Sequence, residues 1–354
     1  QPMKTDFPVS IFQSAALGLV LSLMAGLLSI AFARATGLID VPGREPHKLH
    51  SQPTPVAGGV ALFVIFIVGW LFNAREFGDL WKVALPTLII FGIGLWDDYR
   101  RARFWVKLAL EILAVGILIA FGIQVHVIQI IFTELPVLLT SGLDIVITVL
   151  WVVGMTNAYN FVDSMDGLAT GIAIIASIFL AFTSLFSGQI ALAHFMAFLA
   201  AACYGLYFFN SHPARLFLGD SGALSLGFLL ATTSMLYNPQ IFPQPSSWFV
   251  PVMILGLPIF DICLVIVSRL RRDWPIYQAD RAHTYHRLVM LGLSASQAVS
   301  VLHMVTLLLG CLAFVALNQT PLIANMIFGS VILAGIIAII IMDNPRLWPQ
   351  KEID

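Results

Sequence analysis

The sequence has little charge and little cysteine. Only 10% of its 354 residues are Asp, Glu, Lys or Arg, against about 25% in soluble domains, whereas 59% are hydrophobic. This composition excludes an ordinary soluble domain and indicates a membrane protein. The three cysteines, Cys203, Cys263 and Cys311, lie in apolar runs, which argues against disulfide bonds and against a zinc site.

Long apolar runs take the place of the missing charge. A helix that crosses a bilayer needs about 20 mostly apolar residues. Eleven runs are candidates, of which the third and the fifth are short: 11–33, 56–73, 82–96, 104–122, 143–158, 168–187, 189–209, 221–237, 248–268, 295–317 and 321–342. The sequence therefore predicts an all-α polytopic membrane protein of about eleven transmembrane helices, forming one integral-membrane domain over 1–354. The first run is too long for a cleavable signal peptide, so we expect a membrane helix there.

The basic residues indicate how the chain is oriented. Fifteen of them belong to the face that carries loops 34–55, 97–103, 210–220 and 269–294 and the C-terminus, whereas the opposite face has three, Lys4, Arg75 and Lys82. Loops rich in Lys and Arg stay in the cytoplasm. We therefore expect the N-terminus outside and the C-terminus in the cytoplasm.

Acidic and histidine clusters end several apolar runs on this cytoplasmic face. The clusters are Asp97 with Asp98, Asp163 with Asp166, Asp220, and His283 with His286. A charge beside lipid costs free energy, so several on one face indicate a polar site. Aspartates without cysteines favour a hard cation such as Mg²⁺.

Taken singly, each cluster also has a plainer interpretation. Asp97 and Asp98 could form a solvated turn, and Asp220 with Ser221 could cap the helix that follows. Asp163 and Asp166 are three residues apart, so a helical turn would put them on one face, at a helix start that attracts phosphate. Glu111 lies one turn beyond Lys107, which predicts an ion pair within one helix.

Five motifs in order carry a resemblance to a known family. They read PTPxxGG from Pro53, the Asp97–Asp98 pair, NxxNFVDxxDGLA from Asn157, NxxPAxxFLGDSG from Asn210 and HxxHR from His283. This order, within 40–293, resembles the polyprenyl-phosphate N-acetylhexosamine-1-phosphate transferases, which are relatives of the phospho-MurNAc-pentapeptide transferase. The resemblance implies a UDP-N-acetylhexosamine donor, an undecaprenyl phosphate acceptor and release of UMP.

The resemblance also implies roles for single residues. Magnesium, with manganese as an alternative, would bind at Asp220, and Asp97, Asp98 and Asp163 would be catalytic, with Asp97 as the candidate base. The residues expected to bind the substrates are Lys48, Lys107, Asn160, Asp166, Asn210, Phe217, His283, His286 and Arg287. Tyr285 departs from the family, which usually has a histidine there, and Ser164 stands where a glycine is common.

The resemblance places the protein in the bacterial cytoplasmic membrane, at the first membrane step of a cell-surface glycan. N-acetylglucosamine is the commonest donor sugar, with other amino sugars and UDP-MurNAc-pentapeptide as alternatives. We expect membrane lipid but no nucleic acid as a partner, and a homodimer is an open alternative. Two readings of a different class are an ion-coupled transporter, disfavoured by clusters at one face rather than at the bilayer midplane, and a noncatalytic binding scaffold.

Overall fold

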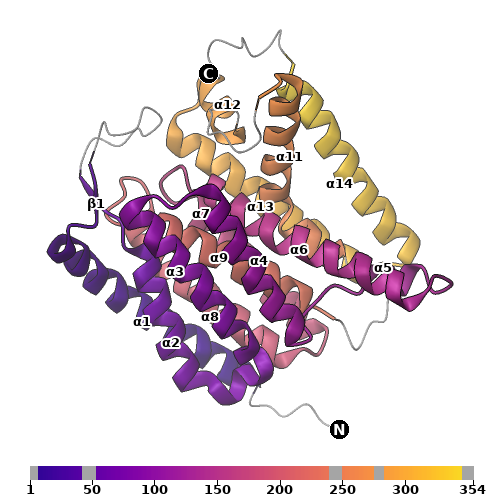
Figure 1. Ribbon diagram of the computed structural model, residues 1–354, viewed down its shortest axis with the longest axis horizontal. Helices are drawn as coiled ribbons and strands as arrows, with labels where there is room; N and C mark the ends of the chain where they lie inside the picture. Colours follow the sequence, from indigo (N-terminus) through magenta and orange to yellow (C-terminus); the bar gives the residue numbers. More distant parts are fainter. Residues whose placement is uncertain (1–6, 42–52, 239–248, 275–282, 345–354) are drawn as a thin grey trace.

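The computed structural model describes residues 7–41, 53–238, 249–274 and 283–344 (Figure 1). Within these residues the chain is almost entirely helical, as expected where a backbone surrounded by lipid must satisfy its own hydrogen bonds. The one described strand pair is antiparallel and short, with β1 (Ile39–Asp40) beside β2 (Thr54–Pro55).

The helices follow one another with mostly short connections. They are α1 (Phe7–Thr36), α2 (Gly58–Phe77), the 3-10 helix η1 (Gly78–Val83), α3 (Ala84–Arg100), α4 (Phe104–Ala120), α5 (Val127–Ile131), α6 (Val137–Val162), α7 (Leu168–Phe186), α8 (Ile190–Asn210), α9 (Gly219–Met235), α10 (Phe249–Ile254), α11 (Gly256–Arg271), α12 (Thr284–Met290), α13 (Ala295–Leu317) and α14 (Pro321–Met342).

The described residues contain seven helical stretches that are long and apolar enough to cross a membrane. They are Val9–Thr36, Gly58–Arg100, Val137–Val162, Leu168–Phe186, Ile190–Asn210, Ala295–Leu317 and Pro321–Met342. The second stretch joins α2, η1 and α3 and so includes two of the expected runs. The other expected runs coincide with α4, α9 and the α10–α11 pair, which are shorter. The helical membrane architecture is confirmed, and the count of eleven stays a prediction.

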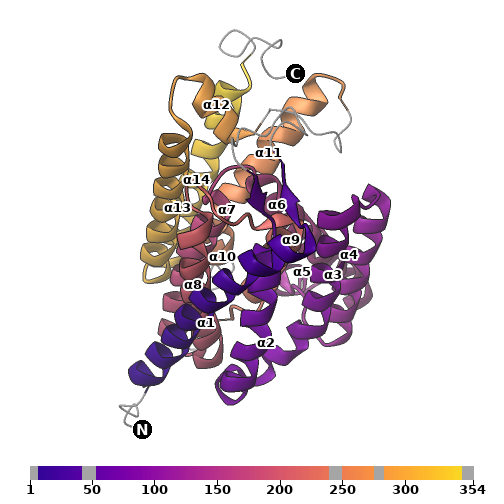
Figure 2. The ribbon, with the colours of Figure 1, turned by 90° about the vertical axis from the view of Figure 1, so that its left-hand side faces the viewer.

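The helices form two groups with a shared centre. Figure 1 shows α1–α4 on one side of the bundle and α11–α14 on the other, with α6, α7 and α9 between them. In Figure 2, α1 begins at the lower end of the bundle and α14 ends at the upper end. The helix α1 packs along α8, and α9 packs against α2, α3, α6 and α7.

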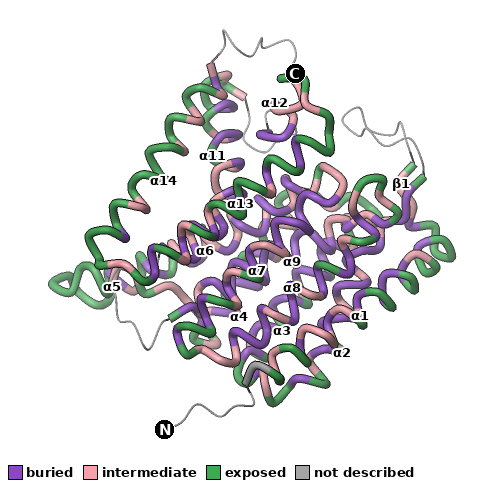
Figure 3. The backbone as a smooth tube through the Cα atoms, turned by 180° about the vertical axis from the view of Figure 1, so that it is seen from behind, coloured by how far each residue is buried: buried purple, intermediate pink, exposed green. Residues whose placement is uncertain are grey.

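The helix α9 is the centre of the core. Every residue from Ser221 to Ser234 is buried, whereas most of α14 is exposed, a contrast visible in Figure 3. Small residues, chiefly Gly, Ala, Ser and Thr, make up much of α9. Such residues allow neighbouring helix backbones to come close, which is how membrane helices gain packing energy when lipid is as apolar as the core.

Two glycines on neighbouring helices make room for the start of α9. A Cβ atom on Gly59 of α2 would lie 2.2 Å from Ser221 Oγ, and one on Gly94 of α3 would lie 2.5 Å from Ser221 Cα. The Gly59 N–H also donates to the Leu218 carbonyl at 2.8 Å. Gly59 of the first motif and Gly94 therefore allow the first turn of α9 to pack between α2 and α3.

We predict that Gly94→Ala destabilises the fold by about 1–3 kcal/mol, because the added methyl group overlaps the backbone of α9. The matched control is Gly92→Ala on the same helix, where nothing lies within 4 Å of the added atom. That change should leave stability unchanged or raise it by up to about 1 kcal/mol through helix propensity. Thermal unfolding in detergent measures both variants, and equal midpoints would contradict the packing argument.

Candidate active site

Four helix ends meet at one place beside the start of α9. Asp97 and Asp98 belong to the last turn of α3, Lys107 to the first turn of α4, and Asp220 to the first turn of α9. The last turn of α6 adds Asn160, whose side chain hydrogen-bonds Asp220. The structure thus brings together side chains from four segments that the sequence treats separately.

Lys107 bridges two of the aspartates in this group. Its Nζ donates to Asp97 Oδ2 at 2.7 Å and to Asp220 Oδ2 at 2.8 Å. The two carboxyl groups also lie within hydrogen-bonding distance of each other. Two carboxylates this close repel unless a cation lies between them, and the ammonium group supplies that charge. The ion pair predicted between Lys107 and Glu111 is not what the structure has, because Lys107 points to the two aspartates instead.

Asp98 caps α9 from another helix. Its Oδ1 accepts from the Asp220 N–H at 2.7 Å, and its Oδ2 accepts from the Ser221 N–H at 3.0 Å and hydroxyl at 2.6 Å. A carboxylate suits a helix N-terminus because the free N–H groups there carry positive charge. The prediction that Asp220 and Ser221 cap α9 was wrong: both lie inside its first turn. The catalytic role expected of Asp98 stays a prediction.

Asp163 lies just beyond α6, in the same electrostatic neighbourhood. Burial raises its pKa well above the ordinary carboxyl value, and the nearby carboxylates of Asp220, Asp98 and Asp166 raise the pKa further. Residues 163–167 form a turn rather than the helical turn that the spacing predicted. The acidic neighbourhood therefore carries more negative charge than its own cation, Lys107, neutralises.

Asp166 and Asn210 hold the loop that leads into α9. Asp166 Oδ2 accepts from the Ala214 N–H at 3.1 Å and lies 3.0 Å from His212 Nδ1. The amide of Asn210, which is buried, accepts from the Thr170 hydroxyl at 2.8 Å and donates to the Leu216 carbonyl at 3.1 Å. Their substrate-binding roles stay predictions, whereas their part in shaping the loop is visible.

The backbone of Phe217 connects the loop before α9 to the PTPxxGG motif. Its N–H donates to the Pro55 carbonyl at 2.8 Å, and its own carbonyl accepts from the Gly58 N–H at 2.9 Å. The side chain is partly exposed beside the site. The PTPxxGG and FLGDSG motifs are therefore one structural unit, although Pro55 and Phe217 are 162 residues apart along the chain.

His283 and His286 form a neighbouring group at the start of α12. His283 Nδ1 lies 2.8 Å from Asp261 Oδ2, and Asp261 Oδ1 accepts from the Thr284 N–H at 2.7 Å and hydroxyl at 2.6 Å. Asp261 thus orients the His283 ring, which lies 5.5 Å from the Phe161 ring of α6. From the sequence, Asp261, three residues after Pro258, is expected to face a polar groove at a helix kink, but its apolar run does not indicate a partner 22 residues away.

Tyr285, the departure from the family pattern, is buried between the two histidines. Its ring centroid lies 5.7 Å from that of His283 and 4.2 Å from that of His286. Only 3% of the Tyr285 side chain is exposed. The tyrosine ring therefore packs against both histidine rings.

Arg287 is fully buried and ties three helices together. It donates to the Met342 carbonyl and, at 2.9 Å, to the Ser268 hydroxyl, and it lies 3.6 Å from Asp343. Burial raises the pKa of Asp343, but hydrogen bonds from Arg271 and Ser268 and both arginine charges hold it below its ordinary value. Phosphate binding by Arg287 stays a prediction, and Lys48 lies outside the described residues.

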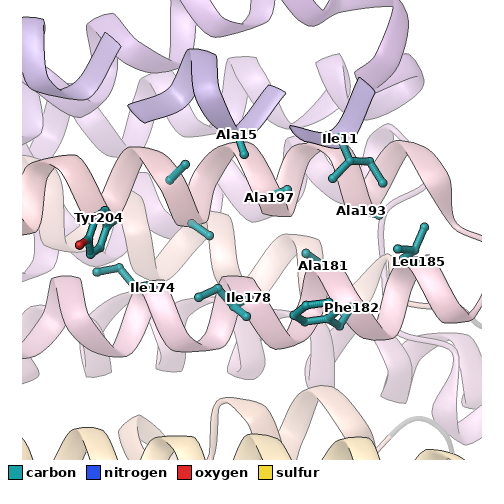
Figure 4. Close-up of a pocket in the computed structure, with 12 residues that line it drawn as sticks. Ile11, Ala15, Ile174, Ile178, Ala181, Phe182, Leu185, Ala193, Ala197 and Tyr204 are labelled. Atoms are coloured by element: carbon teal, nitrogen blue, oxygen red, sulfur yellow. The ribbon is translucent and has the colours of Figure 1, made fainter. Parts of the chain in front are cut away.

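A separate apolar cavity of about 360 Å³ lies between α1, α7 and α8 (Figure 4). Its lining is almost wholly aliphatic, with Phe182 and Tyr204 as the aromatic members, and it includes no acidic or basic residue. None of the predicted site residues borders it. The polar site is therefore defined by converging side chains at helix ends rather than by this cavity.

The residues around Asp220 fit a divalent cation in part. No three His, Cys, Asp or Glu side chains converge into a complete ligand set within the described ranges. Asp97 and Asp220 nevertheless offer carboxylate oxygen atoms close together, and the Asn160 amide hydrogen-bonds Asp220. Mg²⁺ is commonly held by one or two carboxylates, with water and substrate phosphates completing its octahedron, so this donor set suits it.

Comparison with known proteins places the chain in a family. Residues 80–238 match glycosyl transferase family 4. The chain is 30% identical over 293 residues to a probable undecaprenyl-phosphate N-acetylglucosaminyl 1-phosphate transferase of Bacillus subtilis, covering 80% of this chain and 78% of the relative. It is 29% identical over 341 residues to the decaprenyl-phosphate N-acetylglucosaminephosphotransferase of Mycobacterium tuberculosis, covering 87% and 83%.

A third relative is the phospho-N-acetylmuramoyl-pentapeptide-transferase of Staphylococcus carnosus, 29% identical over 289 residues, which are 76% of this chain and 86% of the relative. The matched region includes α3, α4, α6 and α9, whose ends carry the acidic site. The likeness in sequence and the clustering of the motif residues agree: this chain belongs to glycosyl transferase family 4.

Proposed function

We propose that this protein transfers an N-acetylhexosamine-1-phosphate, with N-acetylglucosamine as the favoured sugar, from a UDP-sugar to undecaprenyl phosphate and releases UMP. The observation that carries the proposal is the Asp97–Lys107–Asp220 group at the meeting point of four helix ends. The names of the relatives supply the substrate classes, since two of those compared act on N-acetylglucosamine and a polyprenyl phosphate.

The chemistry of this reaction matches the charges of the site. Transfer between two anionic phosphates requires that their charge be neutralised and that the reacting oxygens be held in line. Mg²⁺, with Mn²⁺ as an alternative, would neutralise the donor diphosphate when bound at Asp220 and Asp97. Lys107 supplies a cation that holds phosphate oxygens, and Asp97 accepts the proton of an acceptor phosphate that is still protonated.

The other predicted residues are proposed to bind the substrates around this centre. Asp163, Asp166, Asn160, Asn210 and Phe217 lie on the nucleoside side. His283, His286 and Arg287, together with Lys48, which is outside the described residues, would bind the phosphates. His283 is suited to such a role because a ring whose Nδ1 is engaged by Asp261 presents Nε2 in one fixed direction.

The proposed topology explains how a lipid and a nucleotide can meet. With about eleven membrane helices, an outer N-terminus and a cytoplasmic C-terminus, the site lies at the cytoplasmic face of the bacterial cytoplasmic membrane. The polyprenyl tail then stays in the bilayer while its phosphate reaches a water-soluble donor. The product would begin a cell-surface glycan of the O-antigen, common-antigen or teichoic acid type, and a homodimer is compatible with this arrangement.

One alternative donor has specific support. The Staphylococcus carnosus relative is a phospho-N-acetylmuramoyl-pentapeptide-transferase, so UDP-MurNAc-pentapeptide is the second candidate. We favour the simpler amino sugar because the relatives named for N-acetylglucosamine match over more of this chain, 80% and 87% against 76%.

The donor specificity is tested by mixing purified protein with undecaprenyl phosphate, Mg²⁺ and a panel of UDP-sugars, and measuring UMP. We expect UMP release with UDP-N-acetylglucosamine that depends on the lipid phosphate, because both phosphates must occupy the site. UMP release only with UDP-MurNAc-pentapeptide would select the alternative donor. Folded protein that binds UDP-sugar but releases no UMP with any donor would refute the transferase.

We predict that Asp220→Asn lowers Mg²⁺-dependent turnover by at least about a hundredfold, the scale expected when one charged transition-state contact is lost. The amide keeps the size of the side chain and removes its charge. The control is Asp79→Asn, an exposed aspartate on η1 that pairs with Lys82, which should leave turnover unchanged. An Asp220→Asn variant that retains its Mg²⁺ response would show that the metal binds elsewhere.

Asp163→Asn should separate stability from activity. Because the pKa of Asp163 is raised in the folded protein, its charged form destabilises the fold, and this penalty grows as pH rises from the ordinary carboxyl pKa to the raised one. The variant should therefore unfold at a higher temperature than the wild type, with a larger difference near about pH 8 than near about pH 5. Turnover should fall.

Thermal unfolding of the substrate-free protein at both pH values measures the effect. Asp79→Asn serves again as the control, since its carboxylate is exposed and should give no pH-dependent difference. A difference for Asp163→Asn that is constant with pH would argue against charge repulsion as the cause.

A further inference from the structure

A second acid lies deeper in the bundle, below the site. Glu111 of α4 is only 1% exposed. Its Oε2 accepts from the Asn157 side chain of α6 at 2.7 Å, whereas its Oε1 has no hydrogen-bond partner in the described part of the chain. A buried carboxylate oxygen without a partner is costly, and in a membrane bundle such a group calls for a functional explanation.

Glu111 lies directly beneath the cation of the site. It follows Lys107 by one helical turn, so the two Cβ atoms are about 5–6 Å apart on one face of α4. Side chains on a helix tilt towards its N-terminus, which directs the Glu111 carboxylate towards Lys107. The positive charge of Lys107 acts on Glu111, although the Lys107 ammonium makes its close contacts with Asp97 and Asp220.

The present position of Lys107 conflicts with metal binding. Its ammonium group lies between Asp97 and Asp220 at 2.7 and 2.8 Å, and these are the carboxylates proposed to hold the divalent cation. A divalent ion and an ammonium ion a few ångströms apart repel strongly in a partly buried site. Lys107 must therefore move when the metal enters, and a desolvated ammonium group needs another anion.

We propose that Glu111 is a positioning residue that receives the Lys107 ammonium when a divalent cation enters between Asp97 and Asp220. The inference rests on the proposed function, because it takes the metal site from it. Asn157 holds Oε2 and so turns the unpartnered Oε1 into the acceptor. In this exchange Lys107 leaves the carboxylates of Asp97 and Asp220 and joins that of Glu111.

The exchange gives Lys107 a defined second position close to the site. Without Glu111, the displaced ammonium would either stay and compete with the metal or leave for solvent. With Glu111, the metal and Lys107 are present together, which gives two cations for substrates that carry several negative charges. Metal affinity should then depend on Glu111 only through Lys107.

A double-mutant cycle tests this coupling, with Mn²⁺ binding to the purified, substrate-free protein measured by electron paramagnetic resonance. Glu111→Gln keeps an oxygen for Asn157 and removes the charge. We expect Glu111→Gln to weaken Mn²⁺ binding about tenfold in the wild-type background. In the Lys107→Met background the loss should be no more than about twofold, because no ammonium group has to find a new anionic partner. Glu134→Gln, the same change at an exposed position, should have no effect.

Equal Mn²⁺ affinity in wild type and Glu111→Gln would overturn the inference, and so would an equal loss in both backgrounds. A wild type that binds no Mn²⁺ would remove the metal site and the exchange together. If the cycle behaves as expected but no UDP-sugar releases UMP, the transferase reaction fails while the exchange stands.

A measurement on the unaltered protein guards against a variant that does not fold. A small amine-reactive reagent, followed by mass spectrometry, reports how accessible each lysine is. Saturating Mg²⁺ should lower labelling of Lys107 several-fold, because the ammonium withdraws towards buried Glu111. Lys82, on η1, should be labelled equally with and without Mg²⁺. Increased labelling of Lys107 would mean that it is expelled into solvent, and would overturn the exchange.

Discussion

The hydrogen bonds that Asp98 accepts from the first turn of α9 are the constraint on which the site depends. The helix α9 is buried along nearly its whole length. The N–H groups of its first turn have no acceptor within the helix, so in this poorly hydrated environment they need one from another segment. Asp98 supplies both carboxylate oxygens from α3. The first turn of α9 can lie this close to α2 and α3 only because Gly59 and Gly94 carry no side chain where these helices pack against Ser221. The position of Asp220 follows from this arrangement, because Asp220 belongs to the helical turn that Asp98 holds.

Charge balance is the second organising feature. Asp97 and Asp220 share one ammonium group, that of Lys107, while burial and then the nearby carboxylates of Asp220, Asp98 and Asp166 raise the pKa of Asp163. A fold that concentrates like charges loses stability, and such an excess is typical of sites prepared for a cation or a cationic transition state. The neighbouring α12 segment has the opposite character, with His283 fixed by Asp261 and Arg287 enclosed by α11 and α14.

Several motif residues make hydrogen bonds that hold the protein's own loops and helix ends in place. Asp166 and Asn210 hold the loop before α9, and Phe217 joins that loop to the first motif through its backbone. A motif identifies positions that the family needs, but it does not distinguish a group that touches substrate from one that places such a group. The hydrogen bonds show that Asp98 holds the start of α9 with both carboxylate oxygens, while its catalytic role stays a prediction.

The sequence alone determined the helical membrane class, the family and most members of the site, because apolar runs and motifs are local patterns that survive without knowledge of the fold. It did not determine which of these residues contact one another. Asp98 and Asp220 are 122 residues apart, Lys107 and Asp220 are 113 apart, and nothing local says which helix ends will meet. For Lys107 the local pattern predicted Glu111, one turn away, whereas the tertiary structure offered two nearer carboxylates. Only the packing of α3, α4, α6 and α9 decided that outcome, since a charged side chain in a partly buried place pairs with whatever opposite charge the fold brings within reach.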